Sequence, residues 1–453
     1  MDINNIKTAY FIGIGGIGMS ALARFLNNRG VSVSGYDRTE TTLTKNLVNE
    51  GINVHYEANT SLIPNNVDVV VYTPAVPEDF EEWKYIHEKK FPVVKRSAFL
   101  ASIVNSLKLI AVSGTHGKTT VSAMIAHAMQ CLEAPFIGFV GGILSKYNKN
   151  IFINKDPKWA VVEADEYDRS FLALNPFISV INAIDADHLD IYGNLESLEA
   201  SFSQFASQTS ANGKVLMYDK IQESKLNFPK NIVKYGFDNK EGFSARNIIV
   251  ANRKFVFDIF IDDKLFYNGV KMSIAGRHNI QNALASFTAL YFSGFDVKKI
   301  ISALETFPGV KRRLELITQN ENLIYFDDYA HHPVEIDALV SAVKELYPDK
   351  KITGIFQPHL YSRTKDFGEQ FGKALAKLDY PVVTDIYPAR EIPIPGIDAN
   401  WLLELTPNKN KKYVKYSEIP EFVKNVNDGI LITIGAGNIE MQVAKIKNTI
   451  EQL

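Results

Sequence analysis

A glycine-rich segment between an apolar run at 107–112 and a stretch of helical spacing at 119–132 could bind a nucleoside triphosphate. Its residues are Gly114, Thr115, His116, Gly117, Lys118, Thr119 and Thr120. Backbone N–H groups of such a loop cradle phosphates, while Lys118 can reach the β and γ oxygens and the Thr119 hydroxyl can bind Mg²⁺. Val112 breaks the full G-x-x-x-x-G-K-[ST] pattern. The G-K-T core in a strand–helix context nevertheless predicts ATP binding rather than a purely structural turn.

A second glycine-rich segment follows the apolar run at 8–12 and matches G-x-G-x-x-G. Its glycines are Gly13, Gly15, Gly16 and Gly18. They would let the backbone approach a diphosphate, whose charge a helix N-terminus favours. Asp37 ends the next expected strand and could accept a hydrogen bond from a ribose hydroxyl. The alternative is a tight turn without a ligand, and the motif does not distinguish NAD from a UDP-sugar.

Acidic residues end two further expected strands of the second unit. Glu163 ends the apolar run at 159–163, and an acidic segment containing His188 follows the run at 177–184. Ligand sites of open α/β sheets lie at the carboxyl ends of strands, and Mg²⁺ prefers oxygen ligands. We therefore expect Glu163 to face the phosphate loop and His188 to ligate a second metal, although an isolated histidine in an acidic loop is more often a surface residue.

These segments require alternating strands and helices to position them. Residues 8–72 follow a βαβ pattern, the second unit continues it, and strands are expected at 323–326, 352–356, 381–384 and 430–434. Such alternation predicts an α/β fold with parallel sheets. Residues 253–274 differ, because aromatic residues flank a turn at 262–264; they suggest an antiparallel hairpin. Domain boundaries are expected near residues 103 and 313.

The composition excludes several classes of protein. The chain has 453 residues with 49 Lys plus Arg and 51 Asp plus Glu, a net charge of −2. This balance argues against a protein that coats nucleic acid, and the length suggests about three domains. A single cysteine, Cys131, excludes an internal disulfide. Neither a secretory signal nor a membrane-spanning run is recognisable, so we expect a cytoplasmic protein.

Five segments, in order along nearly the whole chain, resemble the Mur ligases, the ATP-dependent amide-forming enzymes of peptidoglycan precursor synthesis. They are 13–20, 114–120, 163–166 with Asp168, 327–333, and 356–359 with 361–364. The resemblance is strongest to the alanine-adding branch. It implies a Rossmann-like UDP-binding domain at 1–103, a central P-loop ATPase domain with a small antiparallel sheet at 104–312, and a Rossmann-like amino-acid-binding domain at 313–453.

The resemblance also implies roles for individual residues. Catalytic roles fall to Lys118, His188, His331 and Arg363. ATP would be bound by the 114–120 loop together with Asn279, Asn282, Arg313 and Asp327. The UDP-sugar would be bound by Gly13, Gly15, Gly16, Gly18, Met19, Ser20, Asp37, Glu166 and Asp168. Two Mg²⁺ ions would be held by Thr119, Glu163 and His188.

Two departures from the pattern matter. No lysine occurs between Asp190 and Lys214, so we expect no carbamylated lysine near the second metal. Leu360 stands where family members often carry an arginine, so Arg363 or Lys365 would bind more of the anionic charge there.

The implied reaction joins L-alanine to the muramoyl carboxylate of UDP-N-acetylmuramate through an acyl phosphate, giving ADP and phosphate. The expected partners are these small molecules, not nucleic acid or membrane, and the expected state is a monomer or weak homodimer. Three alternatives remain: a ligase that adds a murein tripeptide to the same sugar, an NAD-dependent oxidoreductase, and a non-catalytic nucleotide-binding regulator.

Overall fold

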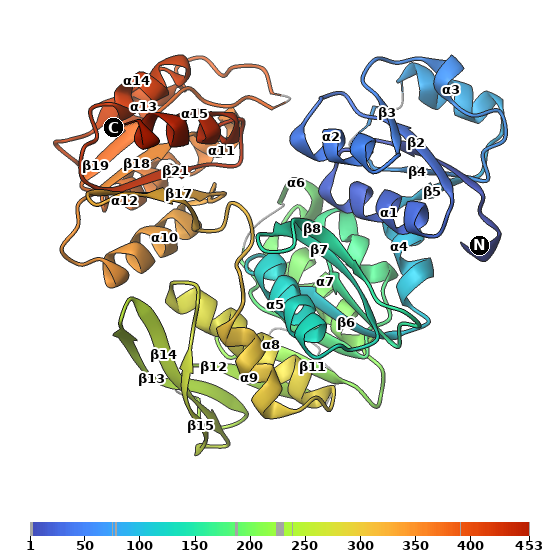
Figure 1. The fold of residues 1–453 in the computed structure, drawn as a ribbon, viewed down its shortest axis with the longest axis horizontal. Coiled ribbons are helices and arrows are strands. Elements are labelled where there is room, and N and C mark those ends of the chain that lie inside the picture. Colours follow the sequence, from blue (N-terminus) through green and yellow to red (C-terminus); the bar gives the residue numbers. More distant parts are fainter. Residues whose placement is uncertain are drawn as a thin grey trace. The chain divides into compact units, whose positions relative to one another are not determined.

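The computed structural model describes residues 3–74, 76–77, 79–185, 189–222, 231–237, 239–389 and 391–452. The chain forms two compact units, which we describe separately. The first comprises Met1–Arg246, Asp258–Val270 and Gln281–Phe307; the second comprises Asn247–Phe257, Lys271–Ile280 and Pro308–Leu453. Three sheets organise the chain, coloured blue, green to yellow, and orange to red in Figure 1. The α/β expectation is confirmed.

The N-terminal sheet is parallel, with strand order β3-β2-β1-β4-β5. Its strands are β1 (Thr8–Ile12), β2 (Ser32–Tyr36), β3 (Asn53–His55), β4 (Val69–Tyr72) and β5 (Val93–Lys95). Its helices are α1 (Ile17–Asn28), α2 (Thr42–Asn49), α3 (Glu81–Glu88) and α4 (Arg96–Val104). The expected βαβ pattern is confirmed, and both glycine loops follow a buried strand and precede a helix.

The central sheet has the order β15-β14-β13-β12-β11-β10-β6-β9-β7-β8. Its first strands are β6 (Lys108–Ser113), β7 (Phe136–Leu144), β8 (Lys149–Ile153), β9 (Trp159–Glu163) and β10 (Ile178–Ile181). The others are β11 (Lys214–Tyr218), β12 (Ile232–Phe237), β13 (Phe243–Ala251), β14 (Lys254–Ile261) and β15 (Lys264–Lys271). Its helices are α5 (Lys118–Cys131), α6 (Leu189–Tyr192), α7 (Leu195–Ser207), α8 (Arg277–Phe292) and α9 (Val297–Glu305).

The expected hairpin is present, with its turn at Asp262 and Asp263, which have φ angles of 47° and 64°. Two consecutive positive φ angles suit the tight turns that join antiparallel strands. The hairpin strands β14 and β15 extend the central sheet at one edge.

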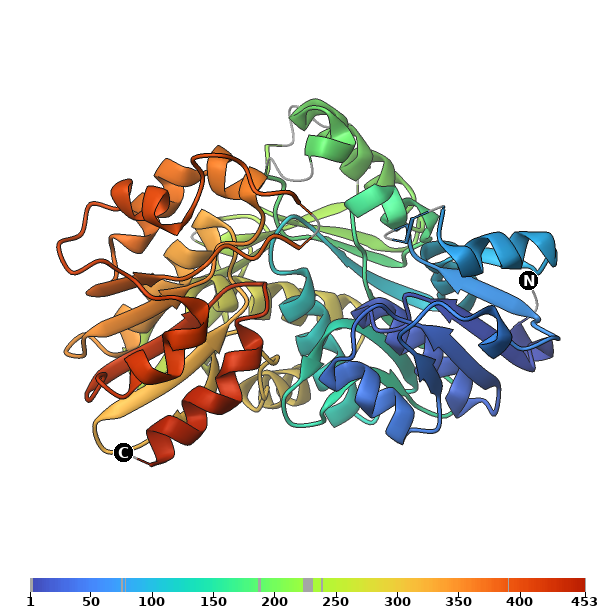
Figure 2. The ribbon, with the colours of Figure 1, turned by 90° about the horizontal axis from the view of Figure 1, so that it is seen from above.

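The C-terminal sheet has the order β16-β17-β21-β18-β19-β20. Its strands are β16 (Glu315–Gln319), β17 (Leu323–Asp328), β18 (Ile352–Phe356), β19 (Tyr380–Val383), β20 (Lys412–Tyr413) and β21 (Gly429–Ile434). Its helices are α10 (Pro333–Leu346), α11 (Tyr361–Asp366), α12 (Gly368–Leu375), α13 (Ala399–Glu404), α14 (Ile419–Val423) and α15 (Glu440–Glu451). Helices lie on both faces of this sheet (Figure 2). Separate apolar cores lie under them, one under α10, α12 and α13 and the other under α14 and α15.

Across the part of the chain that the structure describes, no helix has the length and apolar character needed to span a bilayer.

Candidate active site

The phosphate loop connects β6 to α5. Its glycines are required because other residues lie too close to the loop backbone for a side chain to fit. Gly114 and Gly117 have φ angles of 127° and 83°, which side-chain-bearing residues rarely adopt. A Cβ atom on Gly117 would lie 2.1 Å from Asn182 Nδ2 and 2.6 Å from Asn282 Oδ1. The loop therefore lies directly against two buried amide side chains.

Asn182, just after β10, holds the loop in this conformation. Its Nδ2 donates to the His116 carbonyl oxygen and to Asn282 Oδ1, both at 3.0 Å, while its Oδ1 accepts from the Tyr235 hydroxyl at 2.8 Å. Gln281 Nε2 donates to the Asn182 carbonyl oxygen at 3.0 Å. Sequence reasoning assigned Asn282 to the nucleotide and missed Asn182, whose position after a buried strand of the same sheet was the available signal.

Lys118, the first residue of α5, is paired with a buried carboxylate. Its Nζ donates to the Gly114 carbonyl oxygen at 2.8 Å and to Glu166 Oε1 at 2.7 Å. Burial by itself would lower the pKa of Lys118, but the facing carboxylates, Glu166 foremost, raise it above its ordinary value. Lys118 is therefore a cation at neutral pH, held where a phosphate-loop lysine is needed. Glu166 lies beside the phosphate loop, although the family resemblance assigned it to the UDP-sugar.

The residues present suit Mg²⁺. Glu163 ends β9, and a Cβ atom on Gly141 of β7 would lie 2.1 Å from Glu163 Oε2, so the strand passes directly over this carboxylate. Thr119 lies half-buried in the first turn of α5. Carboxylate and hydroxyl oxygens are the ligands that Mg²⁺ prefers. His188 lies outside the described residues, and within the described ranges no group of three His, Cys, Asp or Glu side chains gathers as a metal site.

Replacing Gly141 by alanine is expected to raise the Mg²⁺ concentration for half-maximal activity about ten- to one-hundred-fold, because the new methyl group displaces the Glu163 carboxylate. A Mg²⁺ titration of ATP turnover measures this. Gly138→Ala in the same strand is the matched control, since its Cβ atom would meet the Phe136 ring at 3.0 Å instead. An equal shift in both variants would indicate distortion of β7 rather than a role of Glu163.

Other predicted residues of the loop also have partners. The Thr115 hydroxyl accepts from the Asp185 backbone N–H at 3.1 Å, and His116 Nε2 lies 3.5 Å from Asp185 Oδ2. Thr120 is buried in α5. These contacts tie the loop to the segment after β10.

The segment 165–169 connects the phosphate loop with the N-terminal sheet. Asp168 and Arg169 have φ angles of 54° and 53°, and the Tyr192 hydroxyl donates to the Glu166 carbonyl oxygen at 2.6 Å. Asp168 forms an ion pair with Lys95, and Asp165 Oδ2 lies 3.6 Å from Arg96 Nη2. The segment therefore contacts both predicted nucleotide sites through acidic side chains.

The N-terminal glycine loop uses Asp37 internally. The Gly15 N–H donates to Asp37 Oδ2 at 2.7 Å, and the Thr39 N–H donates to Asp37 Oδ1 at 3.1 Å. Gly13 has a φ angle of 83° and directs the chain into the loop, while Gly16 precedes α1 and Gly18 lies in its first turn. Met19 and Ser20 are both buried in α1.

A polar cluster in which Arg24 and Asn150 are buried joins α1 to β8. Arg24 binds Glu50 with two hydrogen bonds and donates to Asn150 Oδ1 at 2.8 Å. Asn150 Nδ2 in turn donates to the Ile17 carbonyl oxygen at 2.8 Å. The start of α1 is thus fixed to the central sheet by residues that sequence reasoning did not single out.

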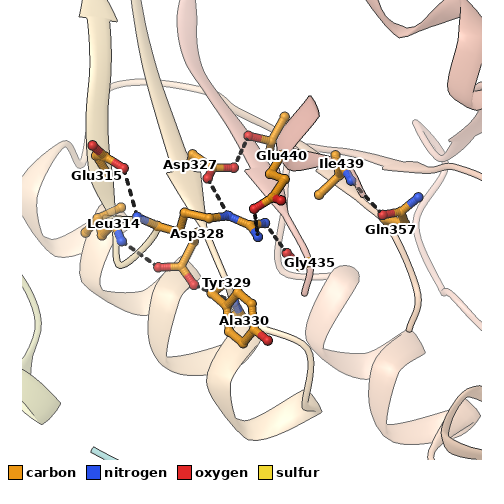
Figure 3. Close-up of polar contacts among 12 residues, drawn as sticks. Leu314, Glu315, Asp327, Asp328, Tyr329, Ala330, Gln357, Gly435, Ile439 and Glu440 are labelled. Carbon is orange, nitrogen blue, oxygen red and sulfur yellow. Dashed lines mark hydrogen bonds and ion pairs between the residues drawn. The ribbon is translucent and has the colours of Figure 1, made fainter. Parts of the chain in front are cut away.

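In the second unit, Arg312 binds the end of β17, and Figure 3 labels its partners Asp327, Gly435 and Glu440. Its Nε donates to Asp327 Oδ2 at 3.0 Å, its Nη1 donates to Glu440 Oε2 at 2.9 Å, and its Nη2 donates to the Gly435 carbonyl oxygen. Asp327 is 1% exposed and also accepts from the Thr433 hydroxyl at 2.6 Å. Asp327, predicted to contact the nucleotide, therefore binds Arg312 and Thr433 in this structure.

Asp328, the next residue, holds the backbone at two places, after Arg313 and after Tyr329. Its Oδ2 accepts from the Leu314 N–H at 2.6 Å and its Oδ1 from the Ala330 N–H at 2.7 Å (Figure 3). Burial raises the pKa of Asp328 from 3.8 to about 6, although Arg313 opposes the rise.

This raised pKa predicts a pH-dependent term in stability. The folded protein binds the Asp328 proton at higher pH than the unfolded chain, so the stabilising contribution is complete below pH 3.8 and is lost as pH rises through about 6. Between about pH 4 and about pH 7, the wild type should lose up to about 3 kcal/mol of unfolding free energy relative to Asp328→Asn. Urea denaturation at both pH values measures the difference.

Asp379 supplies the control for this measurement, because Lys351 and the Ile352 N–H hold its pKa below the ordinary value despite burial. Its contribution is present at neutral pH and is lost only as the pH falls through its lowered pKa. Relative to Asp379→Asn, the wild type should therefore gain unfolding free energy as the pH rises, and this change should occur at lower pH. The same slope in both variants would contradict the assignment to Asp328.

The residues predicted to bind the amino acid lie near the N-terminus of α10. The His331 N–H donates to Glu335 Oε2 at 2.9 Å, and the ring centroids of His331 and His359 are 6.3 Å apart. Burial lowers the pKa of the His331 imidazole, and Arg363 lowers it further although Glu335 opposes this. Burial, helped by His331 and Arg363, lowers the pKa of His359 to about 4. Two imidazoles that are neutral at neutral pH therefore lie in the electrostatic field of Arg363.

The other predicted residues of this unit differ in exposure. Arg313 is half-buried, lies over the Tyr329 ring and has Nη1 3.8 Å from Glu335 Oε1. Asn279 is buried, and its Nδ2 donates to the Ala275 carbonyl oxygen. Leu360 has a φ angle of 69° and precedes α11, which carries Arg363.

These features define an α/β enzyme with a phosphate loop, a buried loop lysine and carboxylates at the ends of neighbouring strands. Family models match three consecutive stretches: the "Mur ligase family, catalytic domain" at 8–107, the "Mur ligase middle domain" at 112–290 and the "Mur ligase, glutamate ligase domain" at 312–436. The chain belongs to the Mur ligase family, whose members are ATP-dependent.

Individual relatives match over the full length. The chain is 41% identical over 455 residues to the UDP-N-acetylmuramate–L-alanine ligase of Christiangramia forsetii and 42% identical over 456 residues to that of Flavobacterium psychrophilum, with at least 99% of each chain covered. The crystal structure of the UDP-N-acetylmuramate–alanine ligase of Thermotoga maritima has a TM-score of 0.85 at 27% identity, covering 98% of this chain and 99% of that one. A murein peptide ligase of Psychrobacter arcticus shares the fold, with a TM-score of 0.72 at 21% identity and 99% coverage of both chains.

Proposed function

We propose that this protein joins L-alanine to the muramoyl carboxylate of UDP-N-acetylmuramate, with cleavage of ATP to ADP and phosphate, in peptidoglycan biosynthesis. The similarity to alanine ligases over the whole length is the observation that supports it most strongly. The lysine-containing phosphate loop beside buried carboxylates is consistent with it. A cytoplasmic location follows from the need for ATP and a nucleotide sugar.

The first step is transfer of the γ-phosphoryl group. An oxygen of the muramoyl carboxylate attacks the γ-phosphorus, the bond from that phosphorus to the bridging oxygen breaks, and ADP leaves. Both reactants are anions, so neutralisation of charge dominates the barrier. Lys118 supplies a buried positive charge at the loop, and its present partner, Glu166, must yield it to the phosphates.

The second step is attack of the alanine nitrogen on the acyl carbon of the resulting acyl phosphate. The carbon–oxygen bond breaks, phosphate leaves, and the amine nitrogen loses a proton. His331 is neutral at neutral pH and is the proposed acceptor of that proton, while Arg363 is the proposed partner of an anionic group.

The metal assignment is also a proposal. Thr119 would hold one Mg²⁺ ion, and Glu163 and His188 would hold the other. Bound Mg²⁺ would shield the phosphate oxygens and align the γ-phosphoryl group. We also propose the domain boundaries 1–103, 104–312 and 313–453. The first family match ends at 107 and the last begins at 312, close to the two internal boundaries, whereas the middle match ends at 290.

Incubation with ATP, Mg²⁺ and UDP-N-acetylmuramate tests the function directly. L-Alanine or murein tripeptide is added in separate reactions, and free phosphate and product mass are measured. We expect phosphate release and a mass gain of one alanine residue only with L-alanine.

The other outcomes separate the alternatives. Turnover only with tripeptide would assign the chain to the tripeptide-adding reaction with the same ATP site. ATP binding without turnover of either acceptor, in protein shown to be folded, would support a nucleotide-binding regulator.

A further inference from the structure

Arg96, the first residue of α4, lies against the N-terminal glycine loop. A Cβ atom on Gly18 would be 2.8 Å from Arg96 Nη1, so the guanidinium contacts the first turn of α1. Its Nη2 lies 3.6 Å from Asp165 Oδ2. We propose that Arg96 binds the diphosphate of the UDP-sugar and that Asp165 holds this side chain when no nucleotide is bound. The proposal rests on the proposed function, since it concerns the substrate of that reaction.

The loop needs a cation because its backbone supplies little charge. The N-terminus of a helix carries about half a positive charge, whereas a diphosphate carries more than one negative charge. Gly16 precedes α1 and has no side chain to cap it, and the Gly15 N–H already donates to Asp37 at 2.7 Å. The Asp37 carboxylate adds negative charge beside the loop. The Arg96 guanidinium beside Gly18 compensates for the small charge of the helix N-terminus and for the negative charge of Asp37.

The contact with Asp165 is weak enough to be exchanged. A nitrogen–oxygen distance of 3.6 Å exceeds the roughly 2.7–2.9 Å of a strong charge-assisted hydrogen bond. The Asp165 side chain is 36% exposed, so water can replace Arg96. Lys95 is a poorer candidate for the diphosphate because it forms a close ion pair with Asp168. The planar guanidinium of Arg96 can instead bind two phosphate oxygens at once.

Binding of UDP-N-acetylmuramate, UDP and uridine to the full-length protein tests the proposal by calorimetry. Arg96→Gln should weaken binding of UDP and of the UDP-sugar about ten- to one-hundred-fold, and leave uridine binding unchanged because uridine has no phosphate. Arg96→Lys should retain part of the affinity. The salt dependence of UDP binding should also decrease in Arg96→Gln, since one ionic contact is lost.

Arg29→Gln is the matched control, because Arg29 lies exposed at the opposite end of α1 and donates to Asn4 Oδ1 at 2.6 Å. It should bind all three ligands as the wild type does. Thermal unfolding of each variant shows that it is folded. Loss of uridine binding in Arg96→Gln would overturn the proposal, since it would indicate a structural role.

Asp165→Asn tests the resting partner. Its Oδ1 can still accept from the Tyr167 N–H, as in the present contact at 3.1 Å, while the charge that holds Arg96 is removed. UDP should bind a few-fold more tightly to Asp165→Asn, and this gain should vanish when Arg96→Gln is also present. Weaker UDP binding to Asp165→Asn would contradict the proposed exchange.

The two proposals fail in different ways. Alanine ligation with unchanged UDP affinity in Arg96→Gln would overturn only the role of Arg96. Arg96-dependent UDP binding without ligation of L-alanine would overturn only the proposed reaction.

Discussion

Replacing Lys118 by methionine is expected to reduce phosphate release from ATP about 100- to 1000-fold or more, while UDP-sugar affinity stays unchanged. Lys118 is the cation that the structure places inside the phosphate loop, bonded to the Gly114 carbonyl oxygen and to Glu166. Removing one preorganised positive charge from a phosphoryl-transfer site has effects of this size. Phosphate release in the complete reaction and a UDP-sugar titration measure the two quantities.

A second variant separates chemistry from folding. Glu166 is fully buried, so Lys118→Met leaves an uncompensated carboxylate, which costs about 3–5 kcal/mol in comparable buried pairs. Lys118→Met combined with Glu166→Gln removes both charges and should recover much of the stability without recovering turnover. Recovery of activity in the double variant would show that Lys118 has only a structural role.

Replacing Arg312 by methionine is expected to lower the unfolding free energy of the second unit by about 3–5 kcal/mol. The Arg312 guanidinium donates to Asp327, to Glu440 and to the Gly435 carbonyl oxygen. Without it, the Asp327 carboxylate remains buried with the Thr433 hydroxyl as a neutral donor. Hydrogen exchange of the β17 and β21 amides measures the loss locally.

The neighbouring arginine provides the control. Arg313 is one-third exposed and lies 3.8 Å from Glu335, so Arg313→Met should change the stability by no more than about 1 kcal/mol. Arg312→Met combined with Asp327→Asn should recover part of the loss. Equal destabilisation by the two single substitutions would contradict the special role of Arg312.

Local patterns predicted most of the fold. The strand–glycine–helix order at 8–28 and 107–131 is encoded by neighbouring residues, because buried strands need apolar runs and the loops need positive φ angles. The hairpin turn at Asp262 and Asp263 was also predictable from neighbouring residues, because aromatic residues flank it on both sides. The strands β3, β5, β7, β8, β11, β12 and β13 and the short edge strands β16 and β20 were not predicted. The two edge strands are defined by their pairing partners rather than by their own residues.

The partners of the predicted site residues were decided by tertiary structure. The contact of Asn182 with the phosphate loop, and the passage of Gly141 over Glu163, join residues from separate strands of one sheet. Strand order is determined by packing across the whole sheet, so the motif alone does not identify these neighbours.

Arg312 and Arg313 show most clearly that sequence motifs do not identify the tertiary partners of a residue. They are adjacent and identical in type, and the resemblance assigned the nucleotide contact to Arg313 and to Asp327. In the structure the backbone of Arg312 has a φ angle of 60°, and its side chain binds Asp327 at the end of β17. By its motifs, the sequence defined the family and the two glycine-rich loops that we propose to bind phosphates. Which arginine is directed to the buried carboxylate depends on a backbone conformation that only long-range contacts stabilise.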